Sequence, residues 1–248
     1  MAMEAEARAL VERLGLRQVI PRPFYENLPL IFYRGSYQEK FEVTICIPGK
    51  DRRYKVDNIG TEPAAIAAFA TISEFTPDLL INAGTAGSFA AQGATIGKVY
   101  LSQSAFYYHD HRIPILGWNK YGLGEYPSLD VSKIAQQLNL EQGNVSSGNS
   151  LDFTAADLDR IEMSGAILKE MEAGAVAWVA FITKTPFFAI KSVTNLIDVN
   201  PDSSTEFEKN FSIAVQSLTE KTLQVIEALS NIDLDNFIKT WRKGEGHF

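Results

Sequence analysis

The sequence is poor in several features that mark whole classes of protein: it has one cysteine, three histidines and no long apolar run. Cys46 cannot form an intrachain disulfide, and its place in the run FEVTICIPG favours a buried strand residue over a nucleophile. No stretch approaches the roughly 20 apolar residues that span a bilayer, and the first residues lack the apolar core of a signal peptide. These absences predict a cytoplasmic protein without a membrane anchor.

Basic charge is also scarce. The 23 Lys and Arg are outnumbered by 30 Asp and Glu, which gives a net charge of −7. Because nucleic-acid affinity depends largely on a basic surface, this balance argues against a nucleic-acid partner and favours small molecules or proteins. A length of 248 residues with 46% hydrophobic content fits one domain spanning residues 1–248 better than two smaller ones.

Strand-like and helix-like patterns alternate along most of the chain. Helical spacing occurs near the start and in the alanine-rich segment 61–75, and a long amphipathic helix is expected over 204–230. Apolar runs of strand length include 28–35 and 41–49, as a hairpin turning at 38–40, and then 79–84, 97–108, 166–171 and 186–192. The pattern predicts an α/β three-layer sandwich with a mixed, twisted central sheet flanked by helices, and a functional loop over 108–127.

Polar residues follow the ends of several expected strands. Ligands of open α/β sheets bind beyond the carboxyl ends of the strands, so this rule gathers four segments: AMEAEA, NAGTAGS, KEMEAG and SVTNLID. We therefore expect Glu6, Thr85, Glu172 and Asn195 to surround one crevice.

Each of these segments also has an ordinary structural explanation. GTAGS permits close approach of a ligand, but it equally suits a tight turn after a strand. Glu172 can accept both hydrogen bonds of a vicinal diol or only offset a helix dipole, and Glu6 is either a general base or a surface residue. His109 and His111, in YHDHR, favour hydrogen bonding over metal ligation, and His247 lies near the end of the chain.

Taken together, the motifs resemble the 5′-methylthioadenosine/S-adenosylhomocysteine nucleosidases of the nucleoside phosphorylase superfamily. AMEAEA, PDLLINAGTAGSF, GATIGKVYLS, YHDHRIP, SSGNSLDF, KEMEAGAVA and SVTNLID occur in the order and spacing of that family across nearly the whole chain. The residues of HDHRIP and SGNSLD, together with Lys191, resemble those of plant-type members more than those of common bacterial members. The resemblance implies a homodimer without metal or cofactor that cleaves an adenine thionucleoside into adenine and a thioribose.

The resemblance also implies roles for individual residues. Glu6 matches the glutamate that activates the attacking water, Glu172 the residue that holds the ribose hydroxyls, and Asn195 the position beside the purine N7. The positions that match substrate-binding residues are Met3, Thr85, Ala86, Gly87, Leu151, Asp152, Glu170, Met171, Lys191 and Thr194.

Asn195 departs from the family pattern, in which an aspartic acid protonates the departing purine. An amide can donate a hydrogen bond to N7 but has no proton to give, and loss of general-acid catalysis typically costs about 10²–10⁴ in rate. Three interpretations stay open: an engineered or otherwise impaired nucleosidase that traps its substrate, a non-catalytic nucleoside-binding homologue, or an enzyme for 6-oxopurine nucleosides, whose O6 and N7 an amide can both serve.

The start of the sequence is a second departure. The family has an apolar strand ahead of its AMxxE segment, and Met1 falls where that strand would end. We expect the sequence to be trimmed or to start late, since a missing central strand would expose the edges of its neighbours.

Overall fold

The computed structural model describes residues 1–200 and 202–243, and His247 lies outside this part. Its elements in chain order are α1 (Glu4–Arg13), β1 (Arg17–Val19), η1 (Pro23–Tyr25), β2 (Ile31–Tyr37), β3 (Phe41–Ile47), α2 (Thr61–Phe75), β4 (Leu80–Ser88), η2 (Ala90–Gln92), β5 (Val99–Tyr108), α3 (Trp118–Leu123), β6 (Gly124–Pro127), α4 (Ser132–Leu138), β7 (Glu141–Ser147), α5 (Ala155–Ser164), β8 (Ala166–Glu170), α6 (Ala173–Thr183), β9 (Phe187–Leu196), α7 (Ser203–Ser230) and α8 (Leu234–Lys243).

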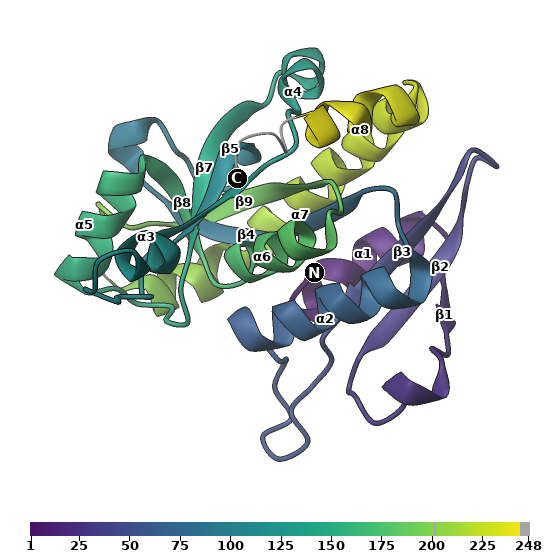
Figure 1. Cartoon of the computed structure of the whole chain (residues 1–248), viewed down its shortest axis with the longest axis horizontal. Coiled ribbons are helices and arrows are strands. Elements are labelled where there is room, and N and C mark those ends of the chain that lie inside the picture. Colours follow the sequence, from purple (N-terminus) through teal and green to yellow (C-terminus); the bar gives the residue numbers. More distant parts are fainter. Residues whose placement is uncertain (201, 244–248) are drawn as a thin grey trace.

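The strands form two separate sheets, as Figure 1 shows. A six-stranded mixed sheet has the order β6-β5-β7-β8-β4-β9. The end strand β9 also pairs with β5, so the sheet closes on itself over the strands from β5 to β9. β1, β2 and β3 form a small antiparallel sheet at the other side of the molecule. The predicted α/β sandwich with a mixed central sheet is confirmed.

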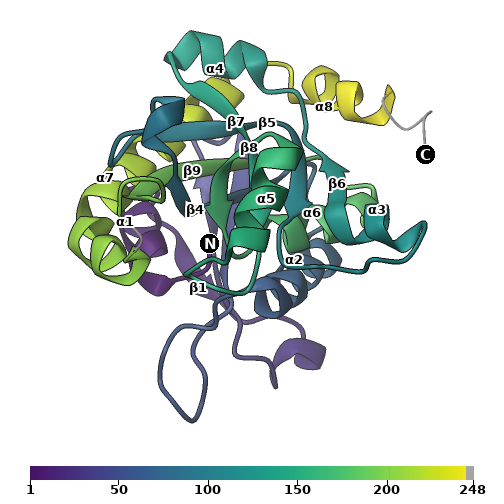
Figure 2. The same cartoon turned by 90° about the vertical axis from the view of Figure 1, so that its left-hand side faces the viewer.

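Helices cover both faces of the central sheet. α2 and α6 pack together over one face, where alanines and valines of α6 meet the strands. α7 lies across the other face against β9 and β4, with α1 beside it. In the view of Figure 2, α4 and α8 lie together at one end of the sandwich. No helix within the described ranges is both long and apolar enough to cross a membrane.

The sequence-based expectations differ from the structure in several segments. GTAGS is not a turn: β4 continues through it to Ser88, because its small residues pair with β9 as far as Leu196, with a register shift between Ala86 and Gly87. The expected loop 108–127 contains α3 and β6, and β6 adds to the edge of β5. β1 and α8 were not predicted, and β9 runs four residues beyond the expected end, which puts Asn195 inside a strand.

Candidate active site

Glu6 is fixed against the middle of β4. It lies one turn into α1, which begins after Met3, and only 1% of it is exposed. Its Oε1 accepts hydrogen bonds from the N–H (2.9 Å) and the hydroxyl (3.0 Å) of Thr85, and its Oε2 accepts from the N–H of Met3 (3.2 Å). Three donors from two elements therefore hold the carboxylate in one orientation at the central sheet.

Lys191 brings a positive charge to the same place. β9 runs parallel to β4 with Lys191 opposite Gly84, and a Cβ at Gly84 would lie 3.5 Å from both the Nζ of Lys191 and the Oε1 of Glu6. Nζ also bonds to the Oε2 of Glu170 at 2.7 Å, with both side chains almost fully buried. The ammonium group thus stands between two carboxylates.

Glu170 ends β8 and anchors the turn into α6. Its oxygens accept hydrogen bonds from the hydroxyl of Ser147 and from the N–H groups of Glu172 (3.0 Å) and Ala173 (2.8 and 3.1 Å). Burial would raise the pKa of Glu170, but the charge and hydrogen bond of Lys191, with the other donors, hold this pKa below its usual value. The structure therefore places Glu170 behind the site, where it supports the backbone of Glu172.

Glu172 stands at the first position before α6 and faces away from that helix. Its side chain makes no capping bond to α6, and Oε1 instead accepts from the N–H of Gly60 at 2.9 Å. Burial and the nearby Glu170 raise the pKa of Glu172 to about 7. Gly60 is needed there, because its φ is +101° and a Cβ would lie 2.8 Å from the side chain of Asn149. Met171 lies half-buried at the same bend.

Asn195 lies buried near the end of β9, opposite Gly87 of β4. The hydroxyl of Thr194 is 3.0 Å from the Oδ1 of Asn195 and 3.2 Å from the carbonyl oxygen of Ala86. A Cβ at Gly87 would lie 2.9 Å from the Nδ2 of Asn195, so only glycine leaves room for the amide. With Oδ1 accepting from Thr194, the free function of this side chain is the N–H donor.

Both Glu6 and Asn195 contact β4, at different points along the strand. Glu6 meets it at Thr85 and Asn195 meets it at Gly87, two residues farther on, or about 7 Å along a strand. At the near end, Glu6 and Thr85 lie beside the network of Lys191, Glu170 and Glu172. Asn195, Thr194, Ala86 and Gly87 form the far end.

The loop that carries Leu151 and Asp152 is tied down by residues that the sequence did not single out. Lys169 donates to the carbonyl oxygens of Ser150 (2.8 Å) and Leu151 (3.1 Å). Asn149, at the base of this loop, accepts from the N–H of Thr61 at 2.8 Å. The sequence did offer one indication of a role for Lys169, because this lysine directly precedes Glu170 in the KEMEAG motif. The purine-contacting role of Leu151 and Asp152 remains a prediction.

Histidine has a structural role here. His109 is buried beside Ser146, with Nδ1 3.1 Å from the hydroxyl oxygen, and burial together with Lys169 lowers its pKa to about 4. It is therefore neutral near pH 7. Among the described residues, no group of three or more His, Cys, Asp or Glu side chains could hold a metal ion.

Comparison with known proteins agrees with this arrangement. A sequence model of the Phosphorylase superfamily matches residues 1–227. The 5′-methylthioadenosine/S-adenosylhomocysteine nucleosidase of Arabidopsis thaliana is 38% identical over 230 residues, which covers 93% of this chain and 90% of the relative. The solved apo structure of the Arabidopsis thaliana 5′-methylthioadenosine nucleosidase superposes with a TM-score of 0.90 at 36% identity, over 94% of this chain and 95% of that one.

A bacterial relative is less similar in sequence than these two plant proteins. The nucleosidase of Staphylococcus carnosus is 28% identical over 80% of this chain and 86% of its own length, so the chain is more similar to the plant enzymes than to this one. The chain belongs to the 5′-methylthioadenosine/S-adenosylhomocysteine nucleosidase family, on the side of its plant members, and has the scaffold of an N-ribosyl hydrolase.

Proposed function

We propose that the protein binds 5′-methylthioadenosine, or the related S-adenosylhomocysteine, and hydrolyses its N-glycosidic bond slowly because Asn195 cannot protonate the departing adenine. The observation that supports this proposal is the hydrogen bonding of the Asn195 amide. Its Oδ1 accepts from Thr194, which leaves Nδ2 as a neutral donor at the far end of the crevice. A neutral donor binds a purine nitrogen but transfers no proton to it.

The near end retains the groups for the other half of the reaction. Glu6 is suited to orient and deprotonate a water molecule, and Lys191 stabilises the charge beside it. Glu172 is suited to hold the two ribose hydroxyls once the ligand displaces the N–H of Gly60. An oxocarbenium-like sugar forms between the two ends, and carboxylates at the near end favour this positive charge. Met3, Met171, Leu151 and Asp152 are proposed to line the substrate.

The test is the release of free adenine from 5′-methylthioadenosine by the protein and by its Asn195→Asp variant. In the variant, one carboxyl oxygen takes the hydrogen bond of Thr194 and the other carries a proton to the purine. We expect the rate to rise about 10²–10⁴-fold, with binding of the substrate changed far less. An Asp variant that is no faster than the parent contradicts the proposal.

Two other functions stay distinguishable in the same experiment. A non-catalytic binding protein would bind 5′-methylthioadenosine tightly in calorimetry and stay inactive as the Asp variant. The donor amide of Asn195 also suits the O6 and N7 of a 6-oxopurine, so faster turnover of inosine than of 5′-methylthioadenosine would favour that class. Whether Asn195 arose naturally or by engineering does not change these outcomes.

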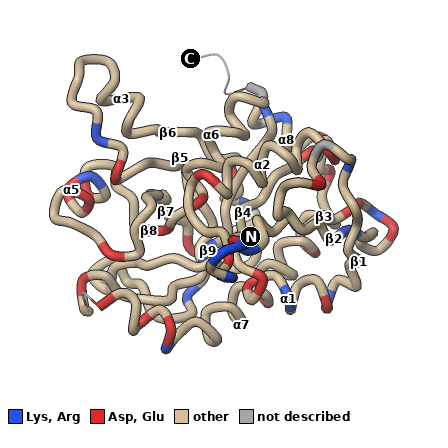
Figure 3. The backbone as a smooth tube through the Cα atoms, turned by 90° about the horizontal axis from the view of Figure 1, so that it is seen from below, with Lys and Arg blue, Asp and Glu red and all other residues tan. Residues whose placement is uncertain are grey.

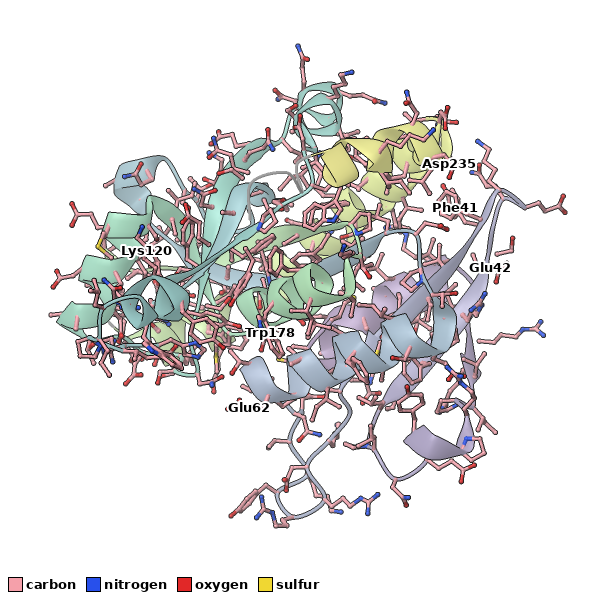
Figure 4. The ribbon with its side chains drawn as sticks, in the orientation of Figure 1. Phe41, Glu42, Glu62, Lys120, Trp178 and Asp235 are labelled. Carbon is pink, nitrogen blue, oxygen red and sulfur yellow. The ribbon has the colours of Figure 1, made fainter. Side chains whose placement is uncertain are left out.

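We also propose a homodimer. Apolar side chains stand exposed along α2 and α6, including Phe69 (51% exposed) and Ile182 (53% exposed), with Trp178 between the helices in Figure 4. Exposed apolar side chains grouped on two packed helices are typical of protein interfaces. Lys, Arg, Asp and Glu are interspersed in the view of Figure 3, which agrees with a protein or small-molecule partner rather than nucleic acid. Sedimentation at micromolar concentration tests the dimer, and a monomer would contradict it.

A further inference from the structure

The loop between β7 and α5, residues 148–154, is held firmly at both ends. Near its start, the N–H of Asn149 donates to the carboxylate of Asp110 at 2.7 Å. At its end, the side chains of Thr154 and Asp157 form the capping box of α5. That helix packs on β8 and β7, beside which it lies in Figure 1. The middle of loop 148–154 therefore spans the distance between two fixed points.

One buried side chain reaches the middle of this loop. The Nζ of Lys169 donates to the carbonyl oxygens of Ser150 (2.8 Å) and Leu151 (3.1 Å). Among the residues that the structure describes, no other side chain forms a hydrogen bond with residues 150–153. Leu151 is 40% exposed, so packing of its own side chain does not fix the loop. The ammonium group of Lys169 is therefore the contact that sets the backbone here.

Lys169 is buried without a matching charge. It is 5% exposed, and its hydrogen bonds go to backbone oxygens rather than to a carboxylate. Burial lowers the pKa of Lys169, and the charges of Asp152 and Asp157 offset this only in part. A buried ammonium group costs free energy unless its N–H groups are bonded. The loop and the ammonium group therefore hold each other in place.

The two carbonyl groups that meet Lys169 determine where the next N–H groups point. In a trans peptide unit the C=O and the following N–H are antiparallel, and the described chain has no cis peptide bond. The N–H of Leu151 therefore points away from Lys169, because the C=O of Ser150 points toward it. The N–H of Asp152 points away for the same reason. Neither N–H has an acceptor within residues 1–200 and 202–243, so the loop presents two free donors.

Lys169 lies at the level of Asn195 in the central sheet. On β4, Gly87 is opposite Lys169 of β8 and also opposite Asn195 of β9. Residues that stand opposite one another project from the same face, and a Cβ on Gly87 would indeed lie 2.9 Å from the amide of Asn195. Two strand spacings, roughly 10 Å, separate Lys169 from Asn195, and Gly87 places no side chain between them. Lys169 therefore holds loop 148–154 over the face that carries the Asn195 amide.

We propose that Lys169 is a positioning residue for the base, which turns the N–H groups of Leu151 and Asp152 toward N1 of an adenine ring. This proposal rests on the proposed function, in which Asn195 meets N7 and the sugar on N9 lies at the near end. N1 belongs to the remaining edge of the ring. It accepts a hydrogen bond in adenine but carries a proton in a 6-oxopurine, so donors fixed at this edge favour adenine.

The test removes the ammonium group from the protein and N1 from the ligand, separately and together. Lys169→Met keeps the apolar stem but cannot bond to the carbonyl groups, and the 1-deaza analogue of 5′-methylthioadenosine has C–H in place of N1. In calorimetry, we expect Lys169→Met to weaken binding of 5′-methylthioadenosine about tenfold, and binding of the 1-deaza analogue by less than about threefold. Equal losses for both ligands would overturn the proposal, because Lys169 would then have only a general structural role.

The unmodified protein provides a test that does not depend on the folding of any variant. It should bind the 1-deaza analogue about tenfold more weakly than 5′-methylthioadenosine, since the analogue leaves the loop donors without an acceptor. Equal affinities would overturn the contact with N1. Tighter binding of 5′-methylthioinosine, the corresponding 6-oxopurine nucleoside, than of 5′-methylthioadenosine would overturn the choice of base.

A lysine far from the site serves as the matched control. Lys40, in the turn between β2 and β3, also donates to a backbone carbonyl oxygen, that of Ser230 at 2.9 Å. Lys40→Met should leave the affinities for both ligands unchanged. A loss as large as that of Lys169→Met would contradict a specific role for Lys169.

The hold on the loop is measured without a ligand. The NMR order parameters of the Leu151 and Asp152 amides should be near about 0.85 in the unmodified protein and fall below about 0.6 in Lys169→Met. Unchanged order parameters would overturn the positioning role. If the unmodified protein binds neither nucleoside, the proposed function fails together with the assignment of N1, whereas the order parameters still decide whether Lys169 positions the loop.

Discussion

The two groups of candidate site residues along β4 differ in charge. At the near end, a buried ion pair joins Lys191 to Glu170, Glu170 also accepts from the N–H of Glu172, and the carboxylate of Glu6 lies beside them, bonded to Thr85. At the far end, the described contacts of Asn195 are with Thr194 and Gly87, which carry no charge. Under the proposed function, the near end would act on the water and the sugar, and the neutral far end would hold the departing base without giving it a proton.

The difference also separates binding from chemistry. An amide and a carboxylic acid have nearly the same shape, so the far end keeps its hydrogen bond to Thr194 and its fit against Gly87. In the proposed reaction, the amide would remove only the transfer of a proton to the base. The following variants act on one end at a time.

The largest effect is expected from removing the carboxylate of Glu6 in the Asn195→Asp background. Glu6→Gln keeps an oxygen for Thr85, loses the acceptor of the Met3 N–H and cannot take a proton from water, and we expect adenine release to fall about 10²–10⁴-fold. The melting temperature serves as the control, because it measures the cost of the lost Met3 hydrogen bond separately from the rate. Retention of the full rate would show that Glu6 is not the base.

Stability should respond more strongly to changes at the charged end. Glu170→Gln leaves the ammonium of Lys191 buried without its partner, and we expect unfolding in urea to show a loss of about 3–5 kcal/mol. Thr194→Val removes a neutral hydrogen bond at the other end and should cost about 1–3 kcal/mol.

A double variant controls for the buried charge. Glu170→Gln combined with Lys191→Met removes both charges and should recover much of the loss from Glu170→Gln. If Glu170→Gln costs no more than Thr194→Val, the ion pair does not organise the near end.

Two glycines of β4 give the smallest and most local comparison. Gly87→Ala places a Cβ 2.9 Å from the amide of Asn195, and overpacking of this kind typically costs about 1–3 kcal/mol. Gly84→Ala meets its neighbours at an ordinary 3.5 Å and should be neutral or stabilising by up to about 1 kcal/mol. Unfolding in urea measures both, and equal losses would contradict the close fit at Asn195.

Much of the fold could be predicted because its signals are local. The hairpin of β2 and β3, the alanine-rich α2 and the long α7 follow from apolar spacing and turn residues. β6, β1 and the extension of β4 could not be predicted in this way. Short edge strands and glycine-rich strand segments have weak propensities, and they form only because a neighbouring strand offers its backbone groups.

The site divides in the same manner. The motifs predicted that Glu6 and Thr85 would meet, and they do. The support of Glu172 by Glu170, and the roles of Ser147 and Lys169, depend on which strands lie side by side, and no spacing in the sequence encodes that order.

The most direct test of the missing proton varies the leaving group. In 4-nitrophenyl 5-methylthioriboside the leaving group is 4-nitrophenolate, which departs without protonation, whereas adenine needs a proton. The ratio of the rates of Asn195→Asp and parent should be about 10²–10⁴ for 5′-methylthioadenosine and within about threefold for the nitrophenyl compound. A ratio that is equally large for both substrates would contradict this account, because Asn195 would then impair a step other than departure of the base.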